Sequence, residues 1–220
     1  HMLDTIKIKI KIYMENSNTL PKHLHDVLIG LMLGDGYLYK TSQTSNSRFE
    51  MSFGTDRVSF AEWVANLFKD YSNTGIIKIY YKKGTPFSKF NYRFKTKTLP
   101  IFNDYHDLFY VKNNVTLKYK KVVPSNINSL MNPVVLAYLL MSDGNFDKSR
   151  NRIRIYTNSY SKVEVERLAK SIQSNLDIYV GVMHDRKDQW ILTIGALQLD
   201  KLRDIVKSHF EPSMLYRIGI

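Results

Sequence analysis

The sequence predicts an α+β protein that contains two copies of one αββαββα unit, with two antiparallel sheets. Residues 28–36 (LIGLMLGDG) and 136–144 (LAYLLMSDG) share one pattern, in which an apolar helical run ends in a small residue, an aspartate and a glycine. After each motif the same order of alternating stretches and amphipathic helices recurs. A chain of 220 residues can bury a sizeable hydrophobic core, and the repeat favours two half-domains that share an interface.

The aspartate of each motif stands at the end of its predicted helix. A helix C-terminus already carries partial negative charge, so an aspartate there is disfavoured unless a cation compensates it. Asp35 and Asp143 are therefore predicted to be metal ligands. One such motif alone is more simply explained as a core helix whose glycine cap happens to follow an aspartate, but a second copy favours a function.

Two buried motif helices are most simply explained as packing against each other across a pseudo-twofold axis. Gly30 and Gly34 lie on one face of the first helix, and Ala137 with Ser142 offers a looser version on the second. Such packing would bring the two aspartates together. Adjacent carboxylates repel each other, and only bound cations or strongly positive surroundings would keep both ionised.

In the first copy, polar and apolar residues alternate over residues 37–40 and 48–53, as in the two strands of a hairpin that exposes one face to solvent. A polar turn separates the two stretches. A helix follows, and Ser59 with Glu62 is predicted to form a capping box at its start. A second hairpin over residues 76–97 and a closing helix complete the unit.

The second copy repeats this order. Ser161 with Glu164 again predicts a capping box, and a hairpin over residues 178–194 and a closing helix follow. Asn132 and Pro133 supply an N-cap and a first-turn proline for the second motif helix.

These boundaries predict two half-domains at residues 20–110 and 133–220. Residues 111–132 are polar and basic and are interpreted as the linker between the halves. Residues 1–19 are interpreted as an N-terminal extension whose first two residues, His and Met, resemble the remnant of a tag.

The composition indicates a polyanionic partner. The formal net charge is +12, and Tyr and Phe supply 15 and 11 residues, a combination typical of nucleic-acid-binding proteins, although a merely solvated basic face is the alternative. The lack of cysteine excludes disulfides, thiolate zinc sites and cysteine nucleophiles. No apolar stretch reaches the roughly 18 residues of a membrane span, and no secretory signal is visible, so no membrane partner is expected.

The hairpins carry most of the candidate binding residues. Residues 76–97 contain seven basic residues and no acidic one, and their alternation is interpreted as placing the cations on one face of a sheet. A solvated face is the usual explanation for one such strand, but a two-stranded ribbon also fits the major groove of DNA. The predicted DNA contacts are Lys40, Arg48, Glu50, Ser52, Lys78, Tyr80, Lys82, Arg93, Lys95 and Lys97 in the first copy, and Lys148, Arg150, Arg152, Arg154, Arg186, Lys187 and Gln189 in the second.

With these features the chain resembles the LAGLIDADG homing endonucleases of the single-chain, two-motif type, and most of all the omega-intron class encoded in organellar introns. The resemblance rests on the paired nonamers, on residues 120–126 (KKVVPSN) and on residues 212–217 (PSMLYR). It implies a monomeric DNA endonuclease whose two sheets form a saddle over a long asymmetric duplex. It also implies a double-strand break with short 3′ overhangs that promotes intron mobility, and a mitochondrial or other organellar location.

The resemblance further implies a metal site. Asp35 and Asp143 would hold Mg²⁺, with Mn²⁺ as a substitute, helped by the backbone carbonyls of Gly34 and Ser142. These are oxygen ligands of the kind that Mg²⁺ requires, and the bound metal would activate the attacking water.

Two cations would complete the catalytic set. Lys121 and Arg217 would flank the scissile phosphates as electrostatic stabilisers or water-orienting groups, with Lys121 chosen over Lys120 on motif alignment alone. Arg217 stands where the family has lysine and cannot act as a base at neutral pH. Tyr138 replaces the third-position glycine of the second motif, which is expected to prevent close helix packing there.

Two alternatives belong to other functional classes. An intron maturase of the same fold would bind its own intron RNA and assist splicing without cleavage, and the basic strands do not distinguish a DNA groove from structured RNA. Retention of both aspartates favours cleavage, because an RNA-binding module gains nothing from an acid pair that repels its ligand. A non-cutting DNA-binding regulator would need an added recognition module, for which 220 residues leave no room.

Overall fold

The computed structural model describes residues 2–16 and 19–220 and divides into two compact units. Unit 1 contains the chain up to His25 together with Gly36–Asp107, and unit 2 contains Asp26–Asp35 together with Leu108–Ile220. His1, part of the expected tag remnant, lies outside the described residues. No described helix is long and apolar enough to cross a membrane.

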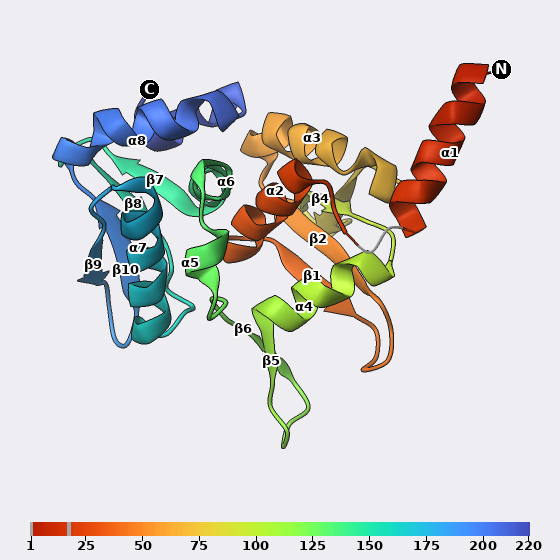
Figure 1. Ribbon diagram of the computed structural model, residues 1–220, viewed down its shortest axis with the longest axis horizontal. Helices are drawn as coiled ribbons and strands as arrows, with labels where there is room; N and C mark the ends of the chain where they lie inside the picture. The colour runs from red at the N-terminus through yellow and green to blue at the C-terminus, as the bar shows by residue number, and fades with distance from the viewer. Residues whose placement is uncertain (1, 17–18) are drawn as a thin grey trace. The chain divides into compact units, whose positions relative to one another are not determined.

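Unit 1 is built around an antiparallel sheet of order β1-β2-β4-β3, with helices over one face (Figure 1). Among the aromatic side chains fully buried in its core are Phe49, Phe53, Phe68 and Phe94. Phe49 contacts both Phe68 and Phe94, with ring centroids 5.5 and 6.5 Å apart. The elements are α1 (Met2–Asn16), the first turn of α2 (Lys22–Leu33), β1 (Tyr37–Lys40), β2 (Ser47–Phe53), α3 (Val58–Leu67), β3 (Ile76–Tyr81), β4 (Lys89–Lys95) and most of α4 (Asn103–Phe109).

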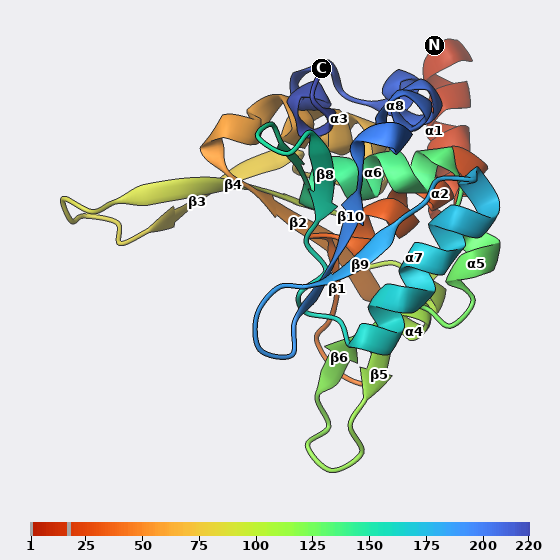
Figure 2. The same cartoon turned by 90° about the vertical axis from the view of Figure 1, so that its left-hand side faces the viewer.

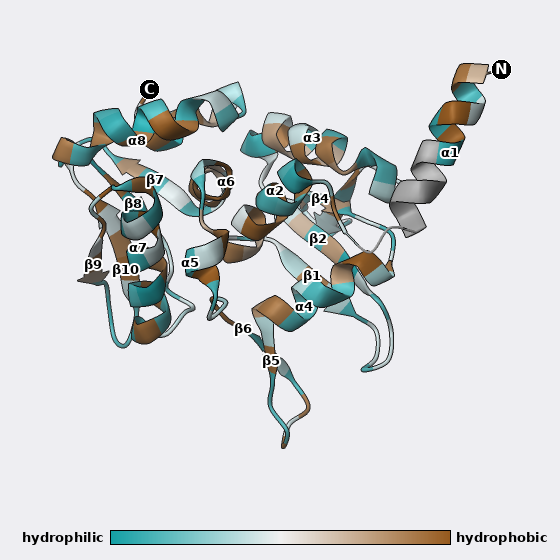
Figure 3. Cartoon of the chain, in the orientation of Figure 1, coloured by the Kyte–Doolittle hydropathy of each residue, from teal (hydrophilic) through white to brown (hydrophobic). Residues whose placement is uncertain are grey.

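Unit 2 repeats this architecture with a sheet of order β7-β8-β10-β9. Its helices α7 and α8 mix hydrophobic and hydrophilic residues along their length, as expected for helices with one face on a core (Figure 3). The elements are the rest of α2, β5 (Tyr110–Lys112), β6 (Tyr119–Lys121), α5 (Ile127–Leu130), α6 (Pro133–Asp143), β7 (Gly144–Asp147), β8 (Arg152–Ile155), α7 (Lys162–Leu176), β9 (Gly181–His184), β10 (Trp190–Ile194), α8 (Leu199–Val206) and a 3₁₀ helix over Pro212–Ile218.

The predicted fold class and the order helix, two strands, helix, two strands, helix are therefore confirmed for both copies. The division of the chain differs from the expected one in two respects. Asp26–Asp35 of the first motif helix packs with the second copy. The expected linker, residues 111–132, folds as most of the β5–β6 hairpin and helix α5, because each contains local pairing or helical hydrogen bonds of its own.

The predicted helix starts are partly confirmed. Ser161 accepts a hydrogen bond from the Glu164 backbone, and the Glu164 side chain returns one to the Ser161 N–H, so the second capping box is present. The box predicted at Ser59 is wrong. A 3₁₀ turn over Thr55–Arg57 runs directly into α3, so the helix begins before Ser59 and no side chain caps it.

Helices α2 and α6 approach closely at the small residues of α2. A Cβ atom on Gly30 would lie 2.6 Å from the Val135 carbonyl oxygen and 2.7 Å from the Tyr138 Cβ, distances that no side chain tolerates. The expectation that Tyr138 prevents close packing is therefore wrong, because Gly30 on the other helix makes room for it. A Cβ atom on Gly34 would similarly lie 2.6 Å from the Ser142 Cβ.

The glycine that follows the second motif aspartate is not required for its conformational freedom. Gly144 has an ordinary extended conformation, with φ of −75° and ψ of 151°. A Cβ atom there would lie 2.5 Å from the Leu140 carbonyl oxygen. The absence of a side chain thus lets the chain leave α6 and enter β7 without a clash.

The β3–β4 register corrects the prediction that the cations of residues 76–97 share one face. Ile77 pairs with Arg93 and Ile79 with Asn91, whereas Lys78 pairs with Tyr92. Directly paired residues of antiparallel strands project to the same side. Lys78 and Tyr80 therefore lie on the face opposite Arg93 and Lys95, because the turn sets a register that the alternation of each strand alone does not reveal.

The close approach of α2 and α6 can be tested at Gly30. Gly30→Ala is expected to lower the free energy of unfolding by about 1–3 kcal/mol, the usual cost of overpacking a core. Gly195→Ala is the matched control, because no atom lies within 4 Å of the added Cβ and φ is −78°. We expect the control to be neutral or to stabilise by up to about 1 kcal/mol. Urea denaturation of both variants measures the difference, and equal stabilities would contradict the packing described.

Candidate active site

The two motif aspartates lie together at the ends of α2 and α6, and both belong to unit 2. Their side chains share a hydrogen bond. The backbone N–H of Asp35 also donates to the Ser142 hydroxyl at 2.7 Å, which ties the end of one helix to the last turn of the other. Asp35 is exposed and Asp143 is partly buried. The helix packing at Gly30 and Gly34 thus brings the two aspartates together, as the sequence predicts.

One cation lies beside each helix end. The Lys121 ammonium donates to the Gly34 carbonyl at 2.7 Å. The Arg217 guanidinium donates to the Ser142 carbonyl at 3.1 Å and to the Gly144 carbonyl at 2.9 Å. The Gly34 and Ser142 carbonyls each immediately precede a motif aspartate, whereas the Gly144 carbonyl follows one. The structure therefore brings Lys121 and Arg217 to the site, whereas Lys120 is exposed on the hairpin.

Burial and like charge at the site shift the pKa values of its ionisable side chains. Burial, and next the charge and hydrogen bond of Asp35, raise the pKa of Asp143 to about 8, although Lys121 and Arg217 act in the opposite direction. Burial likewise lowers the pKa of Lys121 to about 8 against the attraction of both aspartates. Two carboxylates in contact cannot both ionise without further positive charge.

The donor set fits a hard divalent cation. It offers two carboxylates and the carbonyl oxygens of Gly34 and Ser142, and Mg²⁺ binds through one or two carboxylates while it keeps several waters. Within the described residues no group of three or more His, Cys, Asp or Glu side chains could hold a metal ion. An additional cation would also relieve the repulsion between Asp35 and Asp143.

Two groups near the site were not found from the sequence. The Tyr160 hydroxyl donates to the Leu33 carbonyl at 2.9 Å, and burial, with smaller contributions from nearby acids including Asp143, raises the pKa of this phenol. Ser142 is predicted as a small residue of the helix contact and as a carbonyl ligand of the metal, but its side chain also accepts a hydrogen bond from the Asp35 N–H. Tyr160 directly precedes the N-cap of α7, and no sequence pattern distinguishes it from an ordinary buried tyrosine.

In the sheet of unit 2, the two strand arginines are already held by neighbours. Arg152 forms an ion pair with Asp147 at 3.1 Å, and Arg154 donates to Asn145 at 3.3 Å. The Nε atom of Arg154 is buried and has no hydrogen-bond partner. The remaining predicted contacts of this copy lie in or beside turns: Lys148 and Arg150 between β7 and β8, and Arg186, Lys187 and Gln189 between β9 and β10.

In the sheet of unit 1, Glu50 supports its neighbours. It is buried, and it accepts hydrogen bonds from the Tyr37 hydroxyl and, at 2.5 Å, from Arg48 Nε. Burial alone would raise the pKa of Glu50, but these two bonds lower it overall. Both carboxylate oxygens of Glu50 are thus engaged within the sheet, and its contact with DNA stays a prediction. Arg48 is further held 4.4 Å above the Tyr39 ring.

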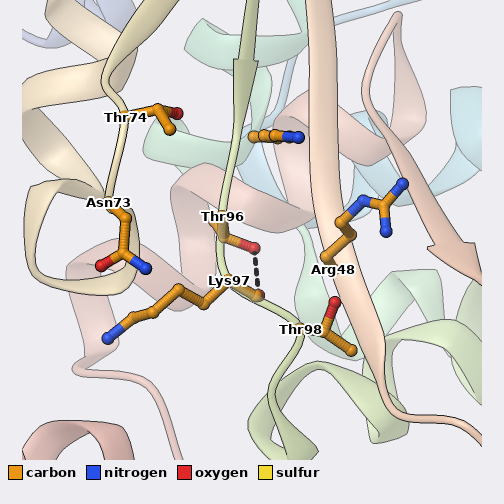
Figure 4. A pocket seen from close by; sticks show the side chains of 7 residues that line it. Arg48, Asn73, Thr74, Thr96, Lys97 and Thr98 are labelled. Atoms are coloured by element: carbon orange, nitrogen blue, oxygen red, sulfur yellow. Dashed lines mark hydrogen bonds between the residues drawn. The ribbon is translucent and has the colours of Figure 1, made fainter.

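The same sheet ends in a cationic pocket of about 300 Å³ (Figure 4). Arg48, Lys95 and Lys97 line it, and no acidic side chain does. The other lining residues, which bear hydroxyl or amide groups, are Asn73, Thr74, Thr96 and Thr98. Arg48, Lys95 and Lys97 are predicted from strand alternation, but the loop residues Asn73 and Thr74 have no signal in the sequence. Lys40 ends β1, and Ser52 and Arg93 are paired across β2 and β4, while Lys82 lies in the β3–β4 turn.

Comparison with known proteins gives consistent results. Cytochrome b mRNA maturase bI2 of Saccharomyces cerevisiae is 25% identical over 211 residues, which cover 93% of this chain but 49% of the yeast protein. DNA endonuclease I-ChuI of Chlamydomonas applanata is 22% identical over 91% of this chain and 96% of its own length. The solved structure of the homing endonuclease I-WcaI bound to its DNA recognition sequence has a TM-score of 0.81 at 21% identity, covering 95% of this chain and 91% of that one.

The chain spans about half the length of the yeast maturase, whereas it covers nearly all of the algal endonuclease. The likeness to I-WcaI shows the same fold. The family model for the LAGLIDADG DNA endonuclease family matches residues 25–202, a range that includes both motifs and both sheets. The chain therefore belongs to the LAGLIDADG DNA endonuclease family.

Proposed function

We propose that this protein is a site-specific homing endonuclease that hydrolyses both strands of a DNA duplex with the help of Mg²⁺. The observation that carries the proposal is the contact between Asp35 and Asp143, each of which follows a carbonyl bonded to a cation. A module that only bound nucleic acid would gain nothing from two adjacent carboxylates, because they repel phosphate. The proposal includes a long asymmetric target, short 3′ overhangs, a monomeric protein and an intron-encoded, organellar origin.

The residues of the site have complementary roles in this reaction. Asp35 and Asp143 would hold the metal, with the Gly34 and Ser142 carbonyls as further oxygen ligands. The bound metal would lower the pKa of the attacking water and neutralise charge at the scissile phosphate. Lys121 and Arg217 would add positive charge beside the two phosphates where negative charge develops. Arg217 stays protonated, so its contribution is electrostatic, whereas Lys121 can also orient or accept a proton from water.

A second candidate function is that of an intron maturase. It is favoured by the similarity to cytochrome b mRNA maturase bI2 over 93% of this chain. The maturase proposal and the endonuclease proposal differ in what they require of Asp35 and Asp143. Splicing assistance would survive their replacement, and DNA cleavage would not.

The primary proposal is tested by incubating the protein and Mg²⁺ with a randomised duplex library and sequencing the ends that form. Ends at one long sequence, on both strands and absent in EDTA, are expected. A library that stays intact under these conditions would contradict the proposal, and binding without ends would favour the maturase alternative.

The metal ligands can be tested on the duplex so identified. Asp35→Asn or Asp143→Asn is expected to abolish double-strand cleavage while binding stays the same or tightens, because each change removes a ligand charge that also repels phosphate. Asp200→Asn is a control, since Asp200 is exposed in the first turn of α8. Gel shift and cleavage assays on the same samples separate the two effects, and loss of binding in step with cleavage would indicate a structural role for the acids.

The two neighbouring lysines provide a matched pair. Lys121→Met is expected to slow cleavage by about 10²- to 10³-fold at saturating protein, the usual effect of removing one preorganised electrostatic stabiliser. Lys120→Met should leave this rate nearly unchanged, since the Lys120 side chain is exposed away from Gly34. Single-turnover rates test the pair, and equal effects would contradict the assignment of Lys121.

The pocket at the end of β4 is expected to contact a backbone phosphate of the target. Lys95→Ala should reduce the slope of log affinity against log salt by about 0.9, the value for one lost phosphate contact. Lys170→Ala, on the exposed face of α7, is the control and should leave the slope unchanged. Binding titrations over a range of salt concentrations measure both slopes. An unaltered slope for Lys95→Ala would remove this residue from the DNA interface.

A further inference from the structure

The sheet of unit 1 has a face that is covered along only part of its length. Helix α3 contacts both β3 and β4. At the start of β3 and near the end of β4, Phe94 is buried, and it shares its face with Ile76, its partner in β3. Farther along, the β3–β4 hairpin extends away from the helices, as Figure 2 shows. A sheet face that leaves its helical cover is expected to become polar, but this one carries aromatic side chains beside Lys78.

Three aromatic rings continue along the uncovered face. Tyr80 pairs with Phe90 in the register, and Tyr92 follows two residues after Phe90 on the same strand and face. The ring centroids of Tyr80 and Phe90 are 5.6 Å apart, and those of Phe90 and Tyr92 are 5.5 Å apart. We call Tyr80, Phe90 and Tyr92 the aromatic ladder. Tyr80 is 50% exposed, so its ring remains accessible at the end of the ladder.

Lysine side chains accompany these rings. The Lys78 ammonium lies 4.9 Å from the centroid of Phe90, and the Lys83 ammonium lies 6.0 Å from that of Tyr80. Residues 71–103 contain no acidic side chain. The hairpin therefore presents accessible rings within a purely positive field, and this field disfavours both a second copy of the chain and a basic partner.

From this arrangement we infer that the aromatic ladder binds a single-stranded segment of nucleic acid, with unpaired bases stacked on the rings and phosphates near the lysines. Exposed aromatic side chains beside cations are the usual means of binding unpaired bases, because every base offers a π-face. Bases within a duplex are already stacked and cannot use such rings. The ladder lies on the face opposite Arg93 and Lys95, so Tyr80, although the sequence predicts it as a duplex contact, does not share a face with those two residues.

The inference is tested with the full chain in EDTA, so that no cleavage interferes. The probes are labelled rU₁₂ and dT₁₂ oligonucleotides and an unrelated 12-base-pair duplex, measured by fluorescence anisotropy. Replacing Phe90 and Tyr80 together by leucine keeps apolar bulk but removes the aromatic faces. We expect the affinity for the single strands to fall about tenfold or more, with less than a twofold change for the duplex.

Tyr179→Leu is the matched control, because Tyr179 is 67% exposed and lies in unit 2. Quenching of 2-aminopurine in a single-stranded probe reports base stacking directly and should disappear only in the ladder variant. A similar loss for rU₁₂ and dT₁₂ would show that unpaired bases suffice, and a loss for rU₁₂ alone would assign the surface to RNA. Unchanged single-strand affinity, or an equal loss for the duplex, would overturn the inference. Because these assays need neither metal nor cleavage, their outcome is independent of the proposed endonuclease activity.

Discussion

The site depends on the close approach of α2 and α6 at Gly30 and Gly34. Each apolar helix ends in an aspartate, and the space left by the two glycines lets the helix ends meet. The packing free energy of the buried apolar side chains thus holds two carboxylates at a separation that their charges oppose. Burial of the apolar parts of both helices and the creation of a repulsive acid pair are two consequences of the same contact.

Two cations partly compensate this repulsion, and they do so through the backbone. Lys121 and Arg217 each donate to the carbonyl before an aspartate, where the partial negative charge of the helix end adds to that of the side chain. The two positions are equivalent in arrangement but differ in chemistry, since only the lysine can lose its proton near neutral pH. Asp35 is exposed whereas Asp143 is partly buried, which adds to this asymmetry. The two strands of a duplex would therefore meet chemically different halves of one site.

Local features of the fold were predictable, whereas features that depend on pairing were not. The motif helices, the Ser161 capping box and the Asn132 N-cap follow from residues a few positions apart. The face occupied by Lys78 depends on the β3–β4 register, and the tolerance of Tyr138 depends on a glycine more than 100 residues earlier. For the site, Asp35 and Asp143 were recognisable from their position at helix ends. Tyr160, Asn73 and Thr74 were not, because their roles arise only when distant segments meet.

The central claim is that packing forces two carboxylates together and that a divalent cation relieves their repulsion. Thermal unfolding of the wild type and of Asp143→Asn, each in EDTA and in excess Mg²⁺, tests it most directly. In EDTA the variant should unfold at the same temperature as the wild type or a higher one, because the repulsion is gone. Mg²⁺ should raise the unfolding temperature of the wild type but not of the variant. A variant that is less stable in EDTA and is stabilised by Mg²⁺ as much as the wild type would contradict the claim.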